Sequence, residues 1–387
     1  MATEAPATGG TRRDRTRRVT LADVARAAGV SASTASLAVN GAGPVAPATR
    51  ERVLSAARSL GYSGPNPLAR SLRRGRCGVV AVVLGERLAY AFSDPMMVGM
   101  LDGLADEVGT AGSSLLLVPL SGPTGAAERL AALPMDAAVV DDCDAATVDL
   151  IPALHARGVV VVGVDGPQGS GIPVVDLDDE AATTALFAHL ADLGHTRFGV
   201  ITLPLALDTV GGPLVPADPA TRERLAKGAG VQRRRTLAAE EAAARHGVSV
   251  RFVEAARNLV DEGERAAATL LDGPLPESPL PGCPRPAGDA RPTAIIAQSD
   301  VLALGCLRAA GTRGLRVPED LSVAGFDGVD LHLFDGTTLT TIEQPASEKG
   351  RTAARLVAAA LSGQQPDDVR LTTRLRVGTT TGPAPGR

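Results

Sequence analysis

The first pattern of apolar positions along the chain predicts a short amphipathic helix. Apolar residues recur there at i, i+3, i+4 and i+7, which is the spacing of one helical face. Thr20, followed three residues later by Asp23, is a capping pattern at the start, and Gly29 suits the left-handed residue that ends a helix. The apolar face consists of Leu21, Val24, Ala25 and Ala28.

A second helix is predicted directly afterwards, from about Ser31 to Asn40, with Ser31 as its N-cap. Two short helices joined by a turn that contains glycine form a helix-turn-helix, in which the second helix enters the DNA major groove. An ordinary helical hairpin in a protein core has the same pattern, so the surrounding chain has to decide between the two. The expected inward face of the second helix is Val30, Thr34, Ala35 and Ala38.

A third helix, from about Pro47 to Leu60, would complete a small three-helix domain by about Tyr62. Residues 63–67 contain a glycine and two prolines and predict a linker. The stretch 68–75 holds helix formers and three arginines, and a helix of that length is marginal in water unless it is paired or bound.

From Cys77 onward, apolar runs of strand length alternate with helical segments. Such alternation is typical of parallel sheets that are covered by helices on both faces, and its two successive sets predict two doubly wound α/β subdomains. A ligand site is expected between them, outside the carboxyl ends of the strands. The strand-like runs are 77–84, 113–120, 136–140, 159–165 and 172–178, then 197–204, 248–255, 294–300 and 321–328; the helical segments are 96–109, 126–133, 145–157 and 180–193, then 232–246, 261–271 and 300–313.

Two stretches interrupt this regularity. Residues 205–230 form a long connection where short ones are usual, and residues 273–292 contain seven prolines. Long connections are typically either functional or disordered. We expect a functional role for the first and disorder for the second.

Composition and charge favour the DNA-binding alternative for the N-terminal segment. The 387 residues are 44% hydrophobic and 21% charged, which is a globular composition, and aromatic residues make up only 2%. The net charge of −4 is uneven: residues 1–76 carry 13 Arg and 4 acidic residues, or +9, and the remainder carries 26 basic and 39 acidic residues, or −13. A basic segment with a helix-turn-helix pattern indicates a nucleic-acid partner. Residues 1–18 predict a disordered basic tail.

The remaining chemistry-bearing residues disfavour an enzyme or a metal site. Four widely spaced cysteines without a C-x-x-C pair indicate free thiols, and with no signal peptide and no membrane-length apolar run we expect a soluble cytoplasmic protein. The histidines form no nucleophile-base-orienter set and have no metal-ligand spacing. No catalytic, cofactor or metal residue is therefore predicted. The cysteines are Cys77, Cys143, Cys283 and Cys306, and the histidines are His155, His189, His195, His246 and His332.

Several ordered motifs make the chain resemble the LacI/GalR family of bacterial transcription regulators over nearly its whole length. The N-terminal ones are VTLADVARAAGVS, TASLAVN, TRERVLSAARSLGY and NPLARSL; the C-terminal ones are TAIIAQSD, GLRVPEDLSVAGFDG and LTTIEQP. The resemblance implies a homodimer that reads a palindromic operator in double-stranded DNA. It also implies an effector domain similar to periplasmic sugar-binding proteins, in which a small molecule bound in the cleft changes the affinity for DNA.

The predicted fold is therefore an all-α helix-turn-helix domain followed by an α/β effector domain of two doubly wound subdomains. The expected boundaries are 1–18 for the tail, 19–64 for the DNA-binding domain, 65–76 for the hinge and 77–382 for the effector domain. Within the effector domain, the N-subdomain is expected at about 77–194 plus 346–368, and the C-subdomain at about 195–345 plus 369–382.

For DNA contacts, the resemblance implies a recognition helix from about Ser31 to Asn40. Ala32 and Ser33 occupy the two positions that mainly discriminate operators in the family, and Leu37 stands where a polar or basic residue is frequent. Because this helix has no arginine or glutamine, we expect thymine-methyl contacts and DNA shape to carry much of the specificity. Ala46 replaces a helix-capping serine that is common in the family. The predicted DNA-binding residues are Thr20, Ser31, Ala32, Ser33, Thr34, Ser36, Leu37, Asn40, Arg70, Leu72 and Arg73.

In the hinge, the resemblance makes Leu72 the side chain that is inserted between central base steps of the minor groove, which bends DNA. Packing of Leu72 against the effector domain is the alternative. Arg70, Arg73 and Arg74 would contact phosphates or the groove walls.

For the effector, the resemblance implies polar residues at strand ends, which suit a hydroxyl-rich ligand. The register of the family's ligand-gripping arginine is open among Arg233, Arg234 and Arg235, with Arg233 as the assignment, and only Phe92 or Phe326 could provide an aromatic face. Asp300 could instead cap a helix, and Asp327 could be a turn residue. The predicted effector contacts are Asp94, Met96, Met97, Arg233, Ser299, Asp300, Asp327 and Gln344.

Together these observations predict a repressor rather than an activator, controlled by a sugar or related metabolite. The alternatives are a regulator without a small-molecule effector and a solute-binding protein of the same fold, which would need an export signal and no DNA-binding segment. We expect dimer contacts along the helices at 96–109 and 126–133, and an order-disorder switch in residues 66–74. The C-terminus has no heptad repeat, which favours a dimer over a coiled-coil tetramer.

Overall fold

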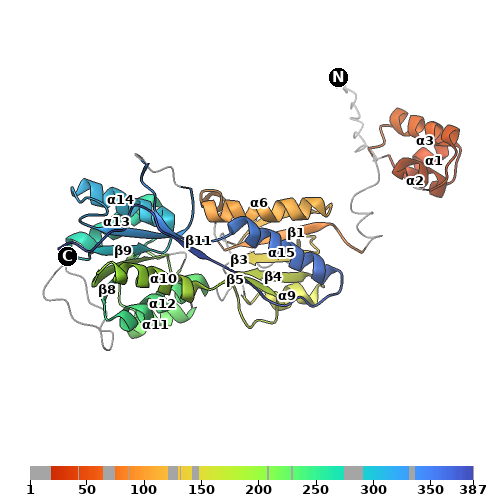
Figure 1. Cartoon of the computed structure of the whole chain (residues 1–387). Coiled ribbons are helices and arrows are strands. Elements are labelled where there is room, and N and C mark those ends of the chain that lie inside the picture. Colours follow the sequence, from red (N-terminus) through yellow and green to blue (C-terminus); the bar gives the residue numbers. More distant parts are fainter. Residues whose placement is uncertain are drawn as a thin grey trace, which may run out of the picture. The chain divides into compact units, whose positions relative to one another are not determined.

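The computed structural model describes two compact units, whose boundary in the sequence lies between Cys77 and Gly78. Figure 1 labels many of the elements of each unit. The predicted tail at 1–18, the predicted hinge residues Arg70, Leu72, Arg73 and Arg74, and most of the predicted helix at 126–133 lie outside the described residues. The structure describes residues 19–41, 43–63, 75–85, 87–120, 130, 132–141, 148–206, 209–227, 230–273, 291–330 and 336–386.

The N-terminal unit is the predicted bundle of three helices. Thr20 and Asp23 form the capping box of the first helix, and Gly29 ends it with a φ of 63°. The predicted inward face of the second helix is confirmed at Ala35 and Ala38, which are buried in the core of the unit, whereas Val30 and Thr34 are partly buried. The helices are α1 (Leu21–Ala28), α2 (Ala32–Asn40) and α3 (Pro47–Ser59).

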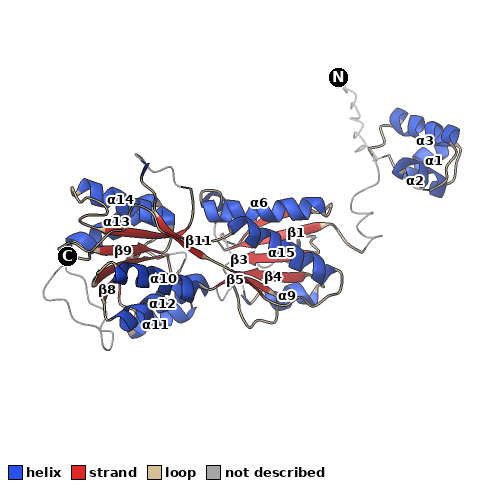
Figure 2. Cartoon of the chain, in the orientation of Figure 1, coloured by secondary structure: helices blue, strands red, loops and turns tan. Residues whose placement is uncertain are grey.

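The C-terminal unit contains two sheets, which Figure 2 shows in red. Their strand orders are β12-β5-β4-β3-β1-β2 and β13-β11-β10-β9-β6-β8-β7, and all neighbours are parallel except β11 with β13 and β7 with β8. The first sheet comprises β1 (Val79–Leu84), β2 (Ser114–Pro119), β3 (Ala137–Asp141), β4 (Val160–Val164), β5 (Val174–Leu177) and β12 (Val369–Leu371). The second comprises β6 (Arg197–Thr202), β7 (Gly212–Leu214), β8 (Ser249–Glu254), β9 (Ala294–Ala297), β10 (Ser322–Asp327), β11 (Thr340–Glu343) and β13 (Arg374–Arg376).

Helices cover both faces of each sheet, as the continuous apolar strands predict. In the first, N-terminal subdomain, residues of α6 and α15 share one apolar core with the sheet, and α9 belongs to the core on the other face. In the second, C-terminal subdomain, α10 and α12 share one core and α13 and α14 the other. These helices, with two short ones, are α5 (Leu88–Ala91), α6 (Pro95–Thr110), α9 (Ile151–Ala156), α10 (Asp179–Asp192), α11 (Pro219–Lys227), α12 (Gly230–His246), α13 (Val260–Asp272), α14 (Asp300–Thr312) and α15 (Ala346–Leu361).

The chain crosses between the subdomains three times, after β5, after β11 and after β12. Two expected boundaries differ from this arrangement. The helix α10 belongs to the C-terminal subdomain, because Leu186 and Leu190 are buried in a core with Phe198, so the first crossing lies at about residue 178 instead of 194. Residues 369–371 belong to the N-terminal subdomain, because β12 pairs with the edge strand β5.

The long connection at 205–230 contains a strand and a helix rather than only a loop. The strand β7 extends the second sheet by antiparallel pairing with β8. Arg224 in α11 donates hydrogen bonds of 2.8 and 2.6 Å to the two carboxylate oxygens of Glu254, which also accepts a 2.8 Å bond from the Leu205 N–H. This contact fixes the connection against the carboxyl end of β8. Among the described residues, no helix is long and apolar enough to cross a membrane.

Two glycines allow α6 and α15 to approach each other closely. A Cβ atom at Gly103 would lie 1.9 Å from the carbonyl oxygen of Ser347, and one at Gly350 would lie 2.0 Å from that of Met100. No ordinary side chain fits at such distances, so both positions require glycine. Gly109, in the same helix α6, has no atom within 4 Å of its Cβ position.

We predict opposite effects for alanine at these two positions of α6. Gly103→Ala should destabilise the chain by about 3 kcal/mol, because the methyl group forces the helices apart. Gly109→Ala should be neutral or stabilise it by about 0.5–1 kcal/mol, because glycine costs backbone entropy inside a helix. Urea unfolding followed by circular dichroism measures both, and similar stabilities of the two variants would contradict the packing described here.

Candidate functional site

The exposed face of α2 carries only small or apolar side chains and one asparagine. Ala32, Ser33 and Asn40 are exposed, Ser36 is partly buried, and Leu37 is 39% exposed. The Asn40 side-chain amide donates a 3.2 Å hydrogen bond to the Ser36 hydroxyl. This face can offer hydroxyl, amide and methyl groups, but no cation and no planar pair of donors in the manner of arginine.

Three of the predicted DNA-binding residues have a local structural role in the unit. The Ser31 hydroxyl accepts a 3.1 Å bond from the Thr34 N–H and so caps α2, and it also lies 2.8 Å from the Thr34 hydroxyl. The Thr20 hydroxyl donates a 2.7 Å bond to Asp23. These contacts fix the start of both helices and leave the Ser31 and Thr20 side chains exposed.

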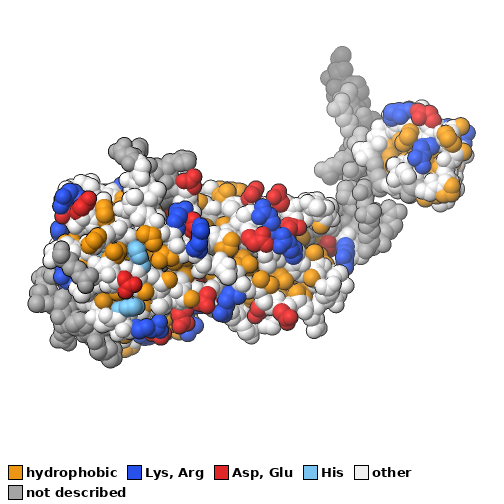
Figure 3. All heavy atoms as spheres, in the orientation of Figure 1, with side chains coloured by type: hydrophobic (Ala, Val, Ile, Leu, Met, Phe, Trp, Pro, Cys, Tyr) orange, Lys and Arg blue, Asp and Glu red, His pale blue; other side chains and the backbone are white. Residues whose placement is uncertain are grey.

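On the α/β unit, charge is mixed rather than concentrated. In the view of Figure 3, acidic and basic side chains alternate over its visible face. Many charged side chains of the unit form surface ion pairs, such as Arg355 with Glu107 at 2.9 Å and Arg316 with Asp320 at 2.9 Å. This visible face therefore lacks the extended basic surface that binds nucleic acid.

A second candidate site lies where the carboxyl ends of the strands of the two subdomains come together. Asp94 caps α6 of the N-terminal subdomain, and its Oδ2 accepts a 3.4 Å bond from the Asn258 side chain, which follows β8 of the C-terminal subdomain. The Asn258 N–H also donates a 2.7 Å bond to the Tyr90 hydroxyl. Ser299, at the end of β9, donates a hydrogen bond to the Asn258 side chain. Asp94 and Ser299 are thus joined through Asn258.

Asp327 and Gln344 form the next group, at the ends of β10 and β11. The Gln344 Nε2 donates a 2.5 Å bond to the Asp327 Oδ1, while its Oε1 accepts a 3.2 Å bond from the ammonium group of Lys349. Because the lysine ammonium can only donate, its bond makes Oε1 the acceptor and so fixes the orientation of the amide. Lys349 also donates bonds of 2.9 and 2.7 Å to Asp165, at the end of β4.

Asp165 and Asp327 are the described non-glycine residues that have positive φ, at 60° and 130°. They belong to different subdomains, and Lys349 and Gln344 link them. Positive φ is strained for residues with a side chain, and such strain is frequent at ligand sites. The turn role considered for Asp327 is therefore combined with a buried carboxylate, since the residue is only 6% exposed.

The arginine of this site is Arg235, not Arg233. Arg233 is exposed, whereas Arg235 is 3% exposed and its guanidinium carbon lies 3.6 Å from the centroid of the Phe326 ring. Arg235 donates a 2.8 Å bond to Asp179 and approaches Asp327 to 3.9 Å. The assignment of Arg233 is corrected by helix geometry, because in α12 residue 235 faces the core and residue 233 faces solvent.

The other predicted ligand residues are placed less favourably. Met97 is buried in the core beneath α6, Met96 is partly buried, and Phe92 is 59% exposed. Asp300 is fully buried, accepting a 2.6 Å bond from the Thr341 hydroxyl and a 2.8 Å bond from the Val329 N–H. Asp300 therefore holds the ends of β10 and β11 in place, and Ser299, not Asp300, caps α14.

The sequence did not predict five residues of this site, and it left Arg234 only as an alternative to Arg233. The five are Tyr90, Asp165, Asp179, Asn258 and Lys349. One of them had a usable signal. Lys349, Ala353 and Leu356 have the i, i+4, i+7 spacing of a buried face, and a lysine on such a face requires an acidic partner. Asp179 looks like an ordinary first-turn acid of a helix, so its pairing depends on the tertiary fold. Within the described ranges, no group of three or more His, Cys, Asp or Glu residues could hold a metal ion.

Burial dominates the ionisation of Asp300 and Asp327. It raises the pKa of Asp300 to about 6, against the opposing effects of the Thr341 and Val329 hydrogen bonds. Burial also raises the pKa of Asp327 well above its usual value, with further contributions from the neighbouring charges of Asp300 and Asp94.

Comparisons with protein families give a match for each unit. Residues 20–66 match the family model described as bacterial regulatory proteins, lacI family, and residues 187–381 match the periplasmic binding protein-like domain. A relative named HTH-type transcriptional regulator, from Mycolicibacterium smegmatis, is 35% identical over 378 residues, covering 95% of this chain and 97% of the relative. The HTH-type transcriptional repressor CytR of Escherichia coli K12 is 29% identical over 368 residues, covering 89% and 90%.

Solved structures give the same architecture. The transcriptional regulator CelR in complex with cellobiose has a TM-score of 0.62 and 26% identity, and the match covers 94% of this chain and 100% of that one. The lac repressor dimer bound to operator and the anti-inducer ONPF has a TM-score of 0.72 at 23% identity, covering 95% and 100%, and supports the fold alone.

We predict that Asp300 makes the chain less stable as pH rises. Its pKa of about 6 in the folded chain exceeds the usual 3.8, so the folded state binds this proton more tightly, and the free energy of unfolding falls between about pH 4 and pH 6. Asp300→Asn cannot ionise and should flatten this fall, as measured by thermal melts across that range. Asp320→Asn is the control, because its ion pair with Arg316 lowers the pKa of Asp320 to about 2. Equal pH profiles for wild type and Asp300→Asn would contradict the prediction.

Proposed function

The chain belongs to the LacI family of bacterial regulatory proteins, and on that premise we propose that it is a homodimeric repressor whose operator affinity is set by a small, hydroxyl-rich molecule. One observation supports this most strongly. The same chain combines a helix pair with an exposed, uncharged recognition face and an α/β unit in which polar groups of both subdomains converge at the strand ends.

For the DNA, we propose that α2 lies in the major groove of each half-site. Ala32 and Leu37 would contact thymine methyl groups, and Ser33, Ser36 and Asn40 would make single hydrogen bonds to base edges. Thr20, Ser31 and Thr34, at the starts of their helices, would face phosphates. In keeping with the family resemblance, Leu72 would be inserted in the minor groove, with Arg70 and Arg73 beside it.

For the effector, we propose direct contacts with Asp94, Asp327, Arg235 and Gln344, with Ser299 acting through Asn258. Carboxylates, an amide and a guanidinium group suit the hydroxyl groups of a sugar or related metabolite. CelR, which shares the fold at 26% identity, was solved with the sugar cellobiose. One face of Phe326 is covered by Arg235, so ring stacking would contribute little here.

For the switch, we propose that copies of the chain pair along α6, where Val98 is 44% exposed, and along residues 126–133. Closure of the subdomains around the effector would order or melt residues 66–74 and so change the affinity for DNA.

A regulator without an effector is the second candidate, and one observation favours it. Gln344, Arg235 and Lys349 already have protein partners for their polar groups. A ligand therefore has to exchange for some of these contacts rather than fill vacant ones. A thermal-shift screen of sugars that includes cellobiose decides between the two candidates. A stabilising sugar whose effect is lost in Asp327→Ala supports an effector, and no shift across the screen supports the second candidate.

We predict that Leu37→Ala weakens binding to the chain's own upstream DNA about tenfold, which corresponds to about 1.4 kcal/mol, because it removes an apolar contact in the groove. Fluorescence anisotropy at fixed salt measures the effect. Leu60→Ala is the matched control, since Leu60 is 38% exposed in the same unit but lies outside α2. Equal losses in both variants would show that Leu37 does not contact DNA.

A further inference from the structure

Arg234 joins the two subdomains directly. It belongs to α12 of the C-terminal subdomain, yet its Nη2 lies 2.9 Å from the Oδ1 of Asp176 in β5 of the N-terminal subdomain. Its Nη1 donates 3.3 Å bonds to the carbonyl oxygen of Asp165 and to the side chain of Gln168. One guanidinium group thus contacts two strand ends of the opposite subdomain.

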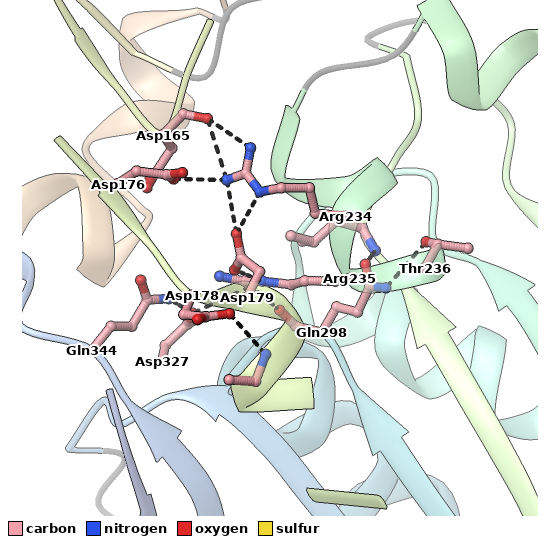
Figure 4. Close-up of polar contacts among 12 residues, drawn as sticks. Asp165, Asp176, Asp178, Asp179, Arg234, Arg235, Thr236, Gln298, Asp327 and Gln344 are labelled. Atoms are coloured by element: carbon pink, nitrogen blue, oxygen red, sulfur yellow. Dashed lines mark hydrogen bonds and ion pairs between the residues drawn. The ribbon is translucent and has the colours of Figure 1, made fainter. Parts of the chain in front are cut away.

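The same guanidinium shares a carboxylate with Arg235. Arg234 donates bonds of 3.0 and 2.8 Å to the Oδ2 of Asp179, and Arg235 donates a 2.8 Å bond to its Oδ1. Figure 4 shows the Asp179 carboxylate between the two arginines. Asp179 is the first residue of α10, directly after the first crossing, and its side chain is fully buried. A displacement of Arg234 therefore removes one of the two cations that hold the Asp179 carboxylate, which is the hydrogen-bond acceptor of Arg235.

The contact can form and break, because it is ionic and reached by water. The Arg234 side chain is 24% exposed, and a surface hollow of about 660 Å³ opens beside it, lined in part by Asp176 and Asp179. Burial opposes the charge of Arg234, but the Asp179 and Asp176 carboxylates outweigh it and raise the pKa of the guanidinium. Arg234 thus stays charged. Its pair with the partly exposed Asp176 competes with water, whereas its pair with the buried Asp179 holds it in the C-terminal subdomain.

We propose that Arg234 is a positioning residue that clamps the two subdomains together without a ligand and holds Arg235 in place for effector binding. The regulatory part of this inference rests on the proposed function. The clamp sets the fraction of molecules that are closed before a ligand arrives. A ligand that binds the closed form gains apparent affinity in proportion to that fraction, so Arg234 tunes the response to the effector.

The test measures closure in the full chain with no sugar present, so that it does not depend on the identity of the effector. Spin labels are attached at Ser93→Cys and Arg257→Cys, which are exposed and lie on opposite sides of the contact between Tyr90 and Asn258. Serine replaces the other cysteines, Cys77, Cys143 and Cys283, while Cys306 is buried and stays unlabelled. Double electron–electron resonance spectroscopy then measures the distance between the two spin labels, which increases when the subdomains open.

We expect one short distance in the parent protein and in Arg233→Gln, which removes the same charge from an exposed neighbour in α12. Arg234→Gln should lower the ratio of closed to open molecules about tenfold, corresponding to about 1.4 kcal/mol, and add a longer distance. Arg234→Lys should restore part of the closure, because an ammonium can still pair with Asp176 or Asp179. Asp176→Asn should open the protein similarly, and adding it to Arg234→Gln should have little further effect.

Three results would overturn the clamp. Arg234→Gln could keep the single short distance of the parent protein, or Arg233→Gln could open the protein as much as Arg234→Gln does. The third is that the effects of Arg234→Gln and Asp176→Asn are fully additive. If Arg234→Gln fails to fold, Asp176→Asn and Arg234→Lys carry the test on their own. Failure of the sugar screen would remove the effector but leave the distance result standing, so the two proposals fail separately.

Discussion

The α/β unit depends on the pairing of the buried Asp179 carboxylate with two arginines. A carboxylate without exposure costs several kcal/mol unless cations and hydrogen bonds replace water. Burial alone would raise the pKa of Asp179, but Arg235 and Arg234 together lower it, so the acid is ionised and both arginines are held. Because these arginines follow one another in α12, one reaches the N-terminal subdomain and the other reaches Phe326 and Asp327. The Asp179 carboxylate thus connects the first crossing, the residues of the strand-end site and the contact between the subdomains.

The two units of the chain depend on different interactions. In the helix-turn-helix, hydroxyl caps and small side chains leave a face that offers few strong base contacts, which is why we propose that specificity depends on methyl groups, DNA shape and the hinge. In the α/β unit, polar groups on strand ends connect two subdomains, and we propose that the balance between their ion pairs and a ligand sets the degree of closure. The core of the three-helix unit consists of alanine and valine, whereas one core of the α/β unit also holds four of the six phenylalanines of the chain.

Periodicity and capping predicted the fold well, whereas side-chain partners depended on tertiary structure. The spacing around Val24 and Ala35 and the alternation of apolar runs with helices gave the three-helix unit and the two sheets. The first crossing could not be placed, because α10 follows the N-terminal sheet in sequence and packs on the other. The assignment of Arg233 instead of Arg235 was wrong for a related reason. Arg233, Arg234 and Arg235 follow one another directly, and only the orientation of α12 decides which of them is buried. The pairing of Lys349 was also not predicted, but the sequence contained a signal for it, since a lysine on an apolar helical face requires an acidic partner.

Titration of the chain's own upstream DNA as a function of salt, with and without a stabilising sugar, tests whether occupancy of the strand-end site controls DNA binding. We expect a steep fall of affinity with salt, which reports phosphate contacts, and a midpoint that the sugar shifts at least about tenfold in the parent protein but not in Asp327→Ala. Binding that is insensitive to salt, or a sugar-induced shift that persists in Asp327→Ala, would contradict it.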